Sequence, residues 1–367
     1  MLKKRDLVGH NLPLLLAGIV ILTLVVLINS FQLPKTDSTV TVGCVLLGSK
    51  DDHGWNEGHY KGIYEDSNLH NTFLKVCENV KEEREDLLNA VETLVREGCT
   101  VVYLTSFGYG KFTDEISQKY PQVAFFSIWG NSIAKNCATY LPRLYQVQYL
   151  AGVIAGAQSK TGKLGFVAAM PNSQTSRSIN SYALGVRFAN PNARLIVKYT
   201  NTWSDEQKER ESVDLLAKLG VDIVSFHQDT PYTINEAEKL GLYSIGYNTI
   251  TENYSDCFLT AAVYNWKIIY KKTLGDYIKG KVNLSDDYWL TLEDNAVKLA
   301  PLSPQVTERA RQLMEQEKER ILNQRSVFSG TIYDNTGKLR CDKDERISDH
   351  ELYYDMDWLV EGVEIYE

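Results

Sequence analysis

From residue 40 onward, apolar segments with the pattern of buried strands alternate with segments that have the periodicity of amphipathic helices. Residues 42–47 form a continuous apolar run, which is typical of a central strand covered on both faces. A predicted helix over 83–96 places its apolar residues on one face, and Gly98 ends it before strands at 100–104 and 123–128. This alternation predicts a parallel, doubly wound α/β sheet.

The same alternation begins again further along the chain, which predicts a second α/β unit. Its expected elements are helix 149–158, strand 164–168, helix 178–188, strand 195–200, helix 206–219, strand 222–226, helix 234–240 and strand 243–247. Beyond them the chain is expected to cross back through strand 258–263, helix 266–278 and strand 288–292. Two α/β units in tandem favour a ligand site at their interface.

The predicted domain organisation has four parts. They are 1–39 (N-terminal signal or membrane anchor and linker), 40–144 plus about 264–290 (first lobe), 145–263 plus about 291–340 (second lobe) and 341–367 (C-terminal docking tail). Within the acidic and aromatic tail, 356–360 is the predicted docking segment.

The N-terminus carries basic residues followed by an apolar run. Lys3, Lys4 and Arg5 precede the run Leu12 to Ile28, which is at the short edge of what spans a hydrocarbon core of ~30 Å. The basic residues favour a cytoplasmic N-terminus. An uncleaved anchor and a cleaved signal peptide both remain open. Either one predicts that the rest of the chain lies on the extracytoplasmic face of the cell membrane.

Composition and motif content exclude several classes of function. A net charge of −8 without a basic face argues against a nucleic-acid partner. No H-E-x-x-H, G-x-S-x-G or Walker A motif is present, and Gly108-Tyr109-Gly110 lacks the third glycine of a dinucleotide fingerprint. The six cysteines have no zinc-binding spacing. Those expected to be small buried hydrophobes are Cys44, Cys77 and Cys99. We therefore expect a binding protein and not an enzyme, with no cofactor and no metal.

Aromatic and polar residues occur together just after several predicted strands. The carboxyl ends of parallel strands meet at one edge of a sheet, where the ligands of open α/β folds bind. Aromatic rings stack on a flat heteroaromatic ligand at ~0.5–1.5 kcal/mol per pair beyond the area buried, and Asp and Asn side chains pair with its edges. The pattern therefore predicts a clamp for a purine. The predicted ligand-binding residues are Asp52, Trp55, Asn56, Phe107, Trp203, Asp229, Tyr247 and Asn248.

Several of these residues also have a purely structural interpretation. Trp55 could cover the edge of the first sheet, Trp203 could pack on the following helix, and Asp229 could cap the next helix. Positions for which core packing and ligand contact both stay open are His59, Trp129 and Trp266.

A series of short motifs follows the first strand and extends over nearly the whole chain. They are Asp52-x-Gly54-Trp55-Asn56, Ser159-Lys160-Thr161-Gly162-Lys163, Ile179-Asn180, Thr200-Asn201-Thr202-Trp203, His227-Gln228-Asp229-Thr230-Pro231, Gly246-Tyr247-Asn248-Thr249 and Met356-Asp357-Trp358-Leu359-Val360. On these motifs, the chain from about residue 41 to its end resembles the basic membrane protein (BMP) family of substrate-binding proteins, which includes purine nucleoside receptor lipoproteins.

The resemblance implies a type I periplasmic-binding-protein fold, in which two lobes joined by crossovers close on a purine nucleoside or nucleobase. It also implies that an ABC permease receives the ligand. Carried over by motif position, it points to Asp52, Trp55, Asn56, Phe107, Trp203, Asp229 and Asn248. The relatives are usually lipoproteins, whereas here no cysteine closely follows the run 12–28. A membrane-anchored nucleoside sensor without a transport role is therefore the alternative.

Overall fold

The computed structural model describes residues 40–130, 135–248, 254–284 and 287–366. The predicted anchor and linker, residues 1–39, lie outside these ranges. Among the described residues, no helix has both the length and the apolar character needed to cross a bilayer.

The amino-terminal lobe is built on a five-stranded parallel sheet in the order β2-β1-β3-β4-β5. Its strands are β1 (Thr41–Val45), β2 (Phe73–Cys77), β3 (Val101–Leu104), β4 (Ala124–Ser127) and β5 (Cys137–Thr139), and its helices are α2 (Trp55–Leu69), α3 (Arg84–Arg96) and α4 (Thr113–Lys119). The short helix η1 (Phe107–Phe112) follows β3. Strand β3 is fully buried, whereas the edge strand β2 is partly exposed, as expected for the centre and the edge of a covered sheet.

The carboxy-terminal lobe is built on a seven-stranded sheet in the order β11-β10-β9-β8-β6-β7-β14. Its strands are β6 (Lys163–Ala168), β7 (Arg194–Tyr199), β8 (Ile223–His227), β9 (Tyr243–Tyr247), β10 (Phe258–Tyr264), β11 (Val297–Leu299) and β14 (Val363–Ile365). Its helices are α5 (Tyr145–Gln158), α6 (Ser173–Ala189), α7 (Glu206–Lys218), α8 (Tyr232–Lys239) and α10 (Glu308–Leu322). Only the β10–β11 pair of this sheet is antiparallel. The predicted α/β fold with parallel sheets is confirmed.

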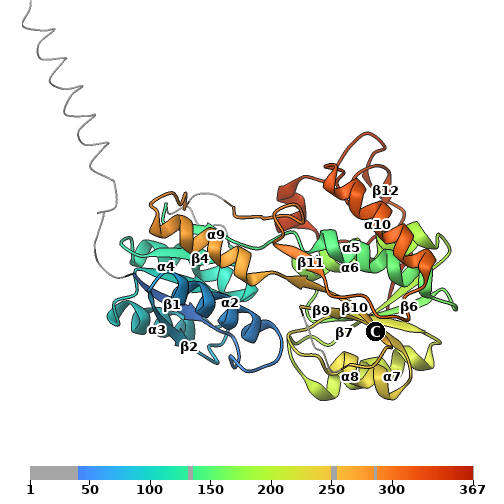
Figure 1. The fold of residues 1–367 in the computed structure, drawn as a ribbon, viewed down its shortest axis with the longest axis horizontal. Helices are drawn as coiled ribbons and strands as arrows, with labels where there is room; N and C mark the ends of the chain where they lie inside the picture. Colours follow the sequence, from blue (N-terminus) through green and yellow to red (C-terminus); the bar gives the residue numbers. More distant parts are fainter. Residues whose placement is uncertain (1–39, 131–134, 249–253, 285–286, 367) are drawn as a thin grey trace, which may run out of the picture.

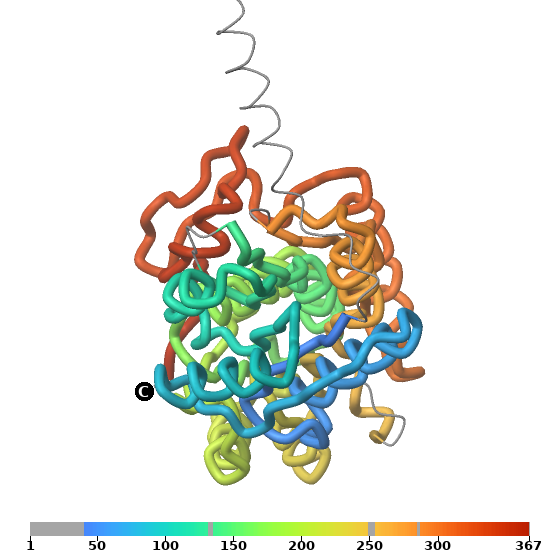
Figure 2. The backbone as a smooth tube through the Cα atoms, turned by 90° about the vertical axis from the view of Figure 1, so that its left-hand side faces the viewer, coloured from blue at the N-terminus to red at the C-terminus, as the bar shows by residue number. Residues whose placement is uncertain are grey.

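Figure 1 shows the two lobes side by side, and Figure 2, turned by 90°, shows one behind the other. The chain passes from β5 into α5, and after β10 it returns to the amino-terminal lobe as α9 (Trp266–Ile278), which packs on α2. It then goes back to the other sheet as β11. A small hairpin, β12 (Ile332–Tyr333) and β13 (Leu339–Cys341), precedes the end of the chain.

The C-terminal strap, residues 351–360, contacts both lobes. It begins with one helical turn, η2 (Glu351–Asp355). On the carboxy-terminal lobe, both ends of the Asn180 amide of α6 bond to the backbone of the strap, at 2.8 and 2.9 Å. On the amino-terminal lobe, the Tyr353 hydroxyl donates to the Ile128 carbonyl just past β4. The strap therefore ties the two lobes together beside the crossovers.

The structure differs from the sequence-based expectation at several elements. No strand forms at 288–292; Asp287 makes one isolated bridge to Thr139, because this extended segment crosses between lobes and has no continuous partner. Helix α6 begins at Ser173, five residues before its predicted start at 178, because Asn172 and Thr175 form a capping box. All six cysteines are free thiols, with Cys77 half-buried rather than buried.

Helices α5 and α6 pack at a distance that only glycine permits. A Cβ atom at Gly152 would lie 2.1 Å from the Tyr182 carbonyl oxygen, and one at Gly185 would lie 2.0 Å from the Tyr149 carbonyl oxygen. Both obstacles are backbone atoms, which cannot rotate away. These glycines therefore set the spacing of the two helices that cover one face of the seven-stranded sheet.

We predict that Gly152→Ala lowers the free energy of unfolding by roughly 1–3 kcal/mol, because the added methyl group must push two packed backbones apart. Gly275→Ala on α9 is the matched control, since its Cβ would meet nothing closer than His70 Nε2 at 3.7 Å. There the higher helix propensity of alanine should leave stability unchanged or raise it by up to about 1 kcal/mol. Chemical denaturation measures both, and equal effects of the two variants would contradict this account.

Candidate ligand-binding site

A small cavity lies between the lobes at the carboxyl ends of the parallel strands, where open α/β folds bind ligands. Its volume is about 10 Å³, close to the space that one water molecule needs. The side chains that line it come from both lobes. They are Trp55, Ser106 and Phe107 from the amino-terminal lobe and Gln174, Trp203, His227, Asp229 and Tyr247 from the carboxy-terminal lobe.

Trp55 begins α2 and combines core packing with a place in the cavity wall. Its indole Nε1 donates to the Thr105 carbonyl at 2.7 Å. Its ring meets Tyr264 and Trp266 edge to face, with centroids 5.7 and 5.4 Å apart. The ring is 5 % exposed. Both interpretations of Trp55, as a cover of the sheet edge and as part of the cleft, therefore describe one side chain.

Phe107 is held in the cavity wall by a clamp on its two neighbours. The Ser106 hydroxyl and the Gly108 backbone N–H both donate to Glu82 Oε1, at 2.5 and 2.7 Å. A Cβ atom at residue 108 would lie 2.2 Å from the Glu82 carboxyl carbon, so glycine is required there. The Phe107 ring stacks on Trp129 with centroids 4.8 Å apart. Glu82 thus positions an aromatic wall residue without lining the cavity.

The opposite wall consists of rings that follow β7, β8 and β9. His227 stacks on Tyr247 with centroids 4.0 Å apart, and Trp203 lies 6.1 Å from His227. Burial, and then the nearby Arg177 charge, lower the pKa of His227 to about 3, so its imidazole is neutral at physiological pH. The Trp203 carbonyl accepts from the Asp229 N–H at 2.8 Å, which fixes the loop that carries the indole.

Asp229 supplies the only carboxylate among the residues that line this cavity. Burial, and then the charges of Asp52, Glu82 and Glu209, raise the pKa of its carboxyl well above the ordinary value. Among the residues that the structure describes, no hydrogen bond to this carboxylate offsets the repulsion. The group is therefore suited to accept hydrogen bonds from a ligand that carries hydroxyl or N–H donors.

The two lobes are in direct contact beside the cavity. The Trp55 backbone N–H donates to the Asp229 carbonyl at 3.1 Å. A Cβ atom at Gly54 would lie 1.8 Å from that same oxygen. The Asn248 amide donates to the Gly54 carbonyl at 3.4 Å. Glycine at position 54 therefore permits backbones from opposite lobes to meet.

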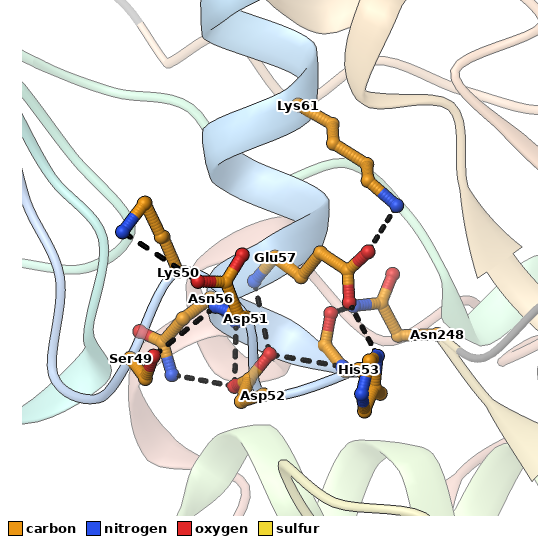
Figure 3. A network of polar contacts seen from close by, with 10 residues as sticks. Ser49, Lys50, Asp51, Asp52, His53, Asn56, Glu57, Lys61 and Asn248 are labelled. Carbon is orange, nitrogen blue, oxygen red and sulfur yellow. Dashed lines mark hydrogen bonds and ion pairs between the residues drawn. The ribbon is translucent and has the colours of Figure 1, made fainter.

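Two of the predicted ligand-binding residues, Asp52 and Asn56, do not line the cavity. The Asp52 carboxylate accepts from the backbone N–H groups of Gly54, Asn56 and Glu57 at 2.9–3.0 Å, at the start of α2. The Asn56 amide donates to Asp52 at 2.8 Å and accepts from the Gly48 N–H. Figure 3 shows this network. Both side chains thus cap α2 and fix the turn that places Trp55.

Asn248, a third predicted residue, lies beside a different hollow. It has a left-handed backbone with φ of 51°, which asparagine tolerates better than most residues. Its Oδ1 accepts from Trp266 Nε1 at 3.2 Å. With Trp266, Tyr254 and Glu57 it lines an open hollow of about 530 Å³. The five other predicted residues line the small cavity: Trp55, Phe107, Trp203, Asp229 and Tyr247.

Sequence reasoning did not select three residues that line the cavity: Ser106, Gln174 and His227. Ser106 and His227 adjoin selected residues at strand ends, and that position was a usable signal. Gln174 gave none, because the predicted start of its helix was placed at 178. The capping pair Asn172 and Thr175 could have moved that start upstream.

We predict that Asp229→Asn raises the melting temperature at pH 8 and leaves it unchanged below about pH 3.8, the ordinary pKa of aspartate. Because the folded-state pKa is raised, ionisation destabilises the folded protein increasingly as pH rises above 3.8. Below that pH both states hold the proton, so the two proteins converge. Differential scanning calorimetry across this range measures the effect.

Asp222→Asn is the matched control for this prediction. Its carboxylate accepts from the Ser159 hydroxyl and from two backbone N–H groups at 2.7–3.0 Å. An asparagine amide would turn a donor toward those donors, so the melting temperature should fall at pH 8. A fall for the Asp229 variant at pH 8 as well would show that its carboxylate makes a stabilising contact.

Comparison with known proteins identifies the family of the chain. Residues 39–331 match the Bmp family, described as PnrA-like ABC transporter substrate-binding proteins. A purine-binding protein of Brucella abortus is 29% identical over 89% of this chain and 94% of its own length. A putative ABC transporter glucose-binding protein of Haloferax volcanii is 27% identical over 90% and 82%. The transcriptional activator protein Med of Bacillus subtilis is 25% identical over 75% and 86%.

Solved structures share the fold at low sequence identity. A solute-binding protein of an Aeropyrum pernix ABC transporter system superposes with a TM-score of 0.69 at 16% identity, covering 78% of this chain and 92% of that one. A transcriptional activator of the comK gene from Bacillus halodurans gives 0.67 at 22%, covering 78% and 99%. The family consists of solute-binding proteins and not enzymes, and it implies a small-molecule ligand, a permease partner and an extracytoplasmic location. The chain belongs to the PnrA-like family of ABC transporter substrate-binding proteins.

Proposed function

We propose that this protein captures a purine nucleoside or nucleobase between its lobes and delivers it to an ABC permease. The observation that carries the proposal is one cavity with aromatic rings from both lobes and a carboxylate that lacks a partner among the described residues. Trp55 and Phe107 from one lobe and Trp203 and Tyr247 from the other present flat surfaces. Stacking and hydrogen bonding to Asp229 are the interactions that a purine with N–H or ribose hydroxyl donors can satisfy together.

Binding requires the lobes to separate, because a cavity of about 10 Å³ has no room for a purine ring. The contacts that must break are the Trp55 N–H bond to Asp229 and the Asn248 bond to Gly54. Hinge motion about the crossovers then opens the cleft, and the lobes close again on the ligand. Closure over a flat ligand buries both aromatic walls against it, and the closed form is the one that a permease distinguishes.

A sensor without a transport role is the second candidate. The similarity to the transcriptional activator Med and to the Bacillus halodurans activator structure favours it. In both proposals residues 1–39 tether the protein at the extracytoplasmic face of the membrane. Deleting the chain should reduce uptake of labelled purine if it serves a permease. Unchanged uptake with altered transcription of purine genes would favour the sensor.

A ligand panel tests the chemical class. The purified protein is heated with adenine, adenosine, guanosine, glucose or single amino acids, and a ligand that binds the folded state raises the melting temperature in proportion to RT ln(1 + [L]/Kd). We expect purine compounds to raise it. Glucose is included because one relative is named a putative glucose-binding protein. A rise with glucose alone would overturn the purine assignment.

We predict that Trp203→Ala weakens binding of the purine identified in this panel by roughly 1–3 kcal/mol, the usual loss when a base loses one stacking ring. The fold should persist, because only the Trp203 backbone carbonyl holds the Asp229 N–H. Trp203→Phe keeps a flat ring and should retain most of the affinity. Calorimetric titration compares the three proteins, and equal affinities would place the indole outside the site.

A further inference from the structure

Gln174 occupies an unusual position in the wall of the cavity. It lies in the first turn of α6, directly after β6, and its side chain is only 4 % exposed. Its Oε1 atom is buried, and within the described ranges of the chain neither end of the carboxamide has a hydrogen-bond partner. An unpaired buried amide destabilises a folded protein by roughly 1–3 kcal/mol. Such a group is suited to pair with a ligand.

The first turn of α6 is held in place from behind, so Gln174 cannot shift to find a partner. The Ser173 hydroxyl donates to the Tyr353 carbonyl of the C-terminal strap at 2.9 Å. The Arg177 guanidinium donates to the Leu352 carbonyl of the same strap. These two residues flank Gln174 in sequence. The strap therefore fixes the direction in which the carboxamide points.

The polar groups near Gln174 on the same lobe are neutral. His227 lines the same cavity, and its Nδ1 pairs with the Ser178 hydroxyl, one turn further along α6, at 2.9 Å. With a pKa of about 3 the imidazole carries no charge at physiological pH. The cavity wall thus offers two kinds of recognition: a carboxylate at Asp229, and an uncharged donor–acceptor pair at Gln174.

We propose that Gln174 is a specificity-determining residue that pairs, through both ends of its carboxamide, with an adjacent donor and acceptor on one edge of a purine. This inference rests on the proposed purine-binding function. Carboxamides read adenine in this bidentate manner, through its exocyclic amino group and the neighbouring ring nitrogen. Rotation of the amide presents the same pair to hypoxanthine, whose ring N–H and carbonyl are adjacent. Guanine presents two adjacent N–H donors on that edge and fits a carboxylate better.

A change of preference distinguishes this role from a structural one. Gln174→Glu replaces a donor and an acceptor with two acceptors. We expect its affinity for adenine and hypoxanthine to fall at least about tenfold, and its preference to move toward guanine, because a bidentate pair discriminates by roughly 5- to 150-fold. Gln174→Met keeps the size without polarity. It should weaken binding of all three bases and should not lower the melting temperature of the unliganded protein.

Gln158 of α5 provides the matched control. Its amide is satisfied at both ends, by the Gln305 carbonyl at 2.9 Å and the Thr307 N–H at 3.0 Å. Gln158→Met should lower the melting temperature and leave the affinities for the three bases unchanged. Isothermal titration of the full chain with adenine, hypoxanthine and guanine is the measurement for every variant.

The outcomes separate this inference from the proposed function. If the unmodified protein binds none of the three bases or their nucleosides, both are overturned. If it binds them and the Gln174 variants keep the original affinities and order of preference, only the role of Gln174 is overturned. A loss of stability in Gln174→Met without any change in preference in Gln174→Glu would assign Gln174 to the scaffold.

Discussion

The meeting of two backbones, at Gly54–Trp55 and at Asp229, is the contact on which the site depends. It brings the carboxyl ends of β1 and β8 together from separate sheets, and it is possible only because residue 54 has no Cβ atom. Asp52 and Asn56 fix the turn on one side, and the Asp229 bond to Trp203 fixes the other. A hydrogen bond of about 1 kcal/mol between the lobes is weak enough to break on opening.

The carboxylate of Asp229 sets an opposing force at the same place. Its charge is held near Asp52, Glu82 and Glu209, and each of these acids has a structural task in its own loop or helix. Repulsion among them favours an open cleft, whereas donors from a ligand would favour a closed one. A site that destabilises the free protein and is relieved by its ligand is a common compromise between stability and function.

The C-terminal strap connects this site to the rest of the fold. Through Ser173, Arg177 and Asn180 it holds α6, and through Tyr353 it reaches the end of β4. The neighbouring Tyr354 lies 6.1 Å from Trp129, which stacks on Phe107 in the cavity wall. The strap thus lies behind both walls. Residues 332–366 fall outside the part that matches the family description, 39–331.

The amino-acid sequence by itself determined the alternation of strands and helices, and hence the parallel α/β fold, because buried strands and amphipathic helices have different apolar periodicities. Position after a strand end also sufficed to find Trp55, Phe107, Trp203, Asp229 and Tyr247, since parallel strands all end at the same edge. Tertiary structure alone decided which polar side chains were already occupied. Asp52 and Asn56 bond to their own helix turn, and Asn248 bonds to Trp266, because each finds a partner within reach after folding. Gln174 finds none among the described residues, and its place in the cavity depends on a strap that lies far away in the sequence.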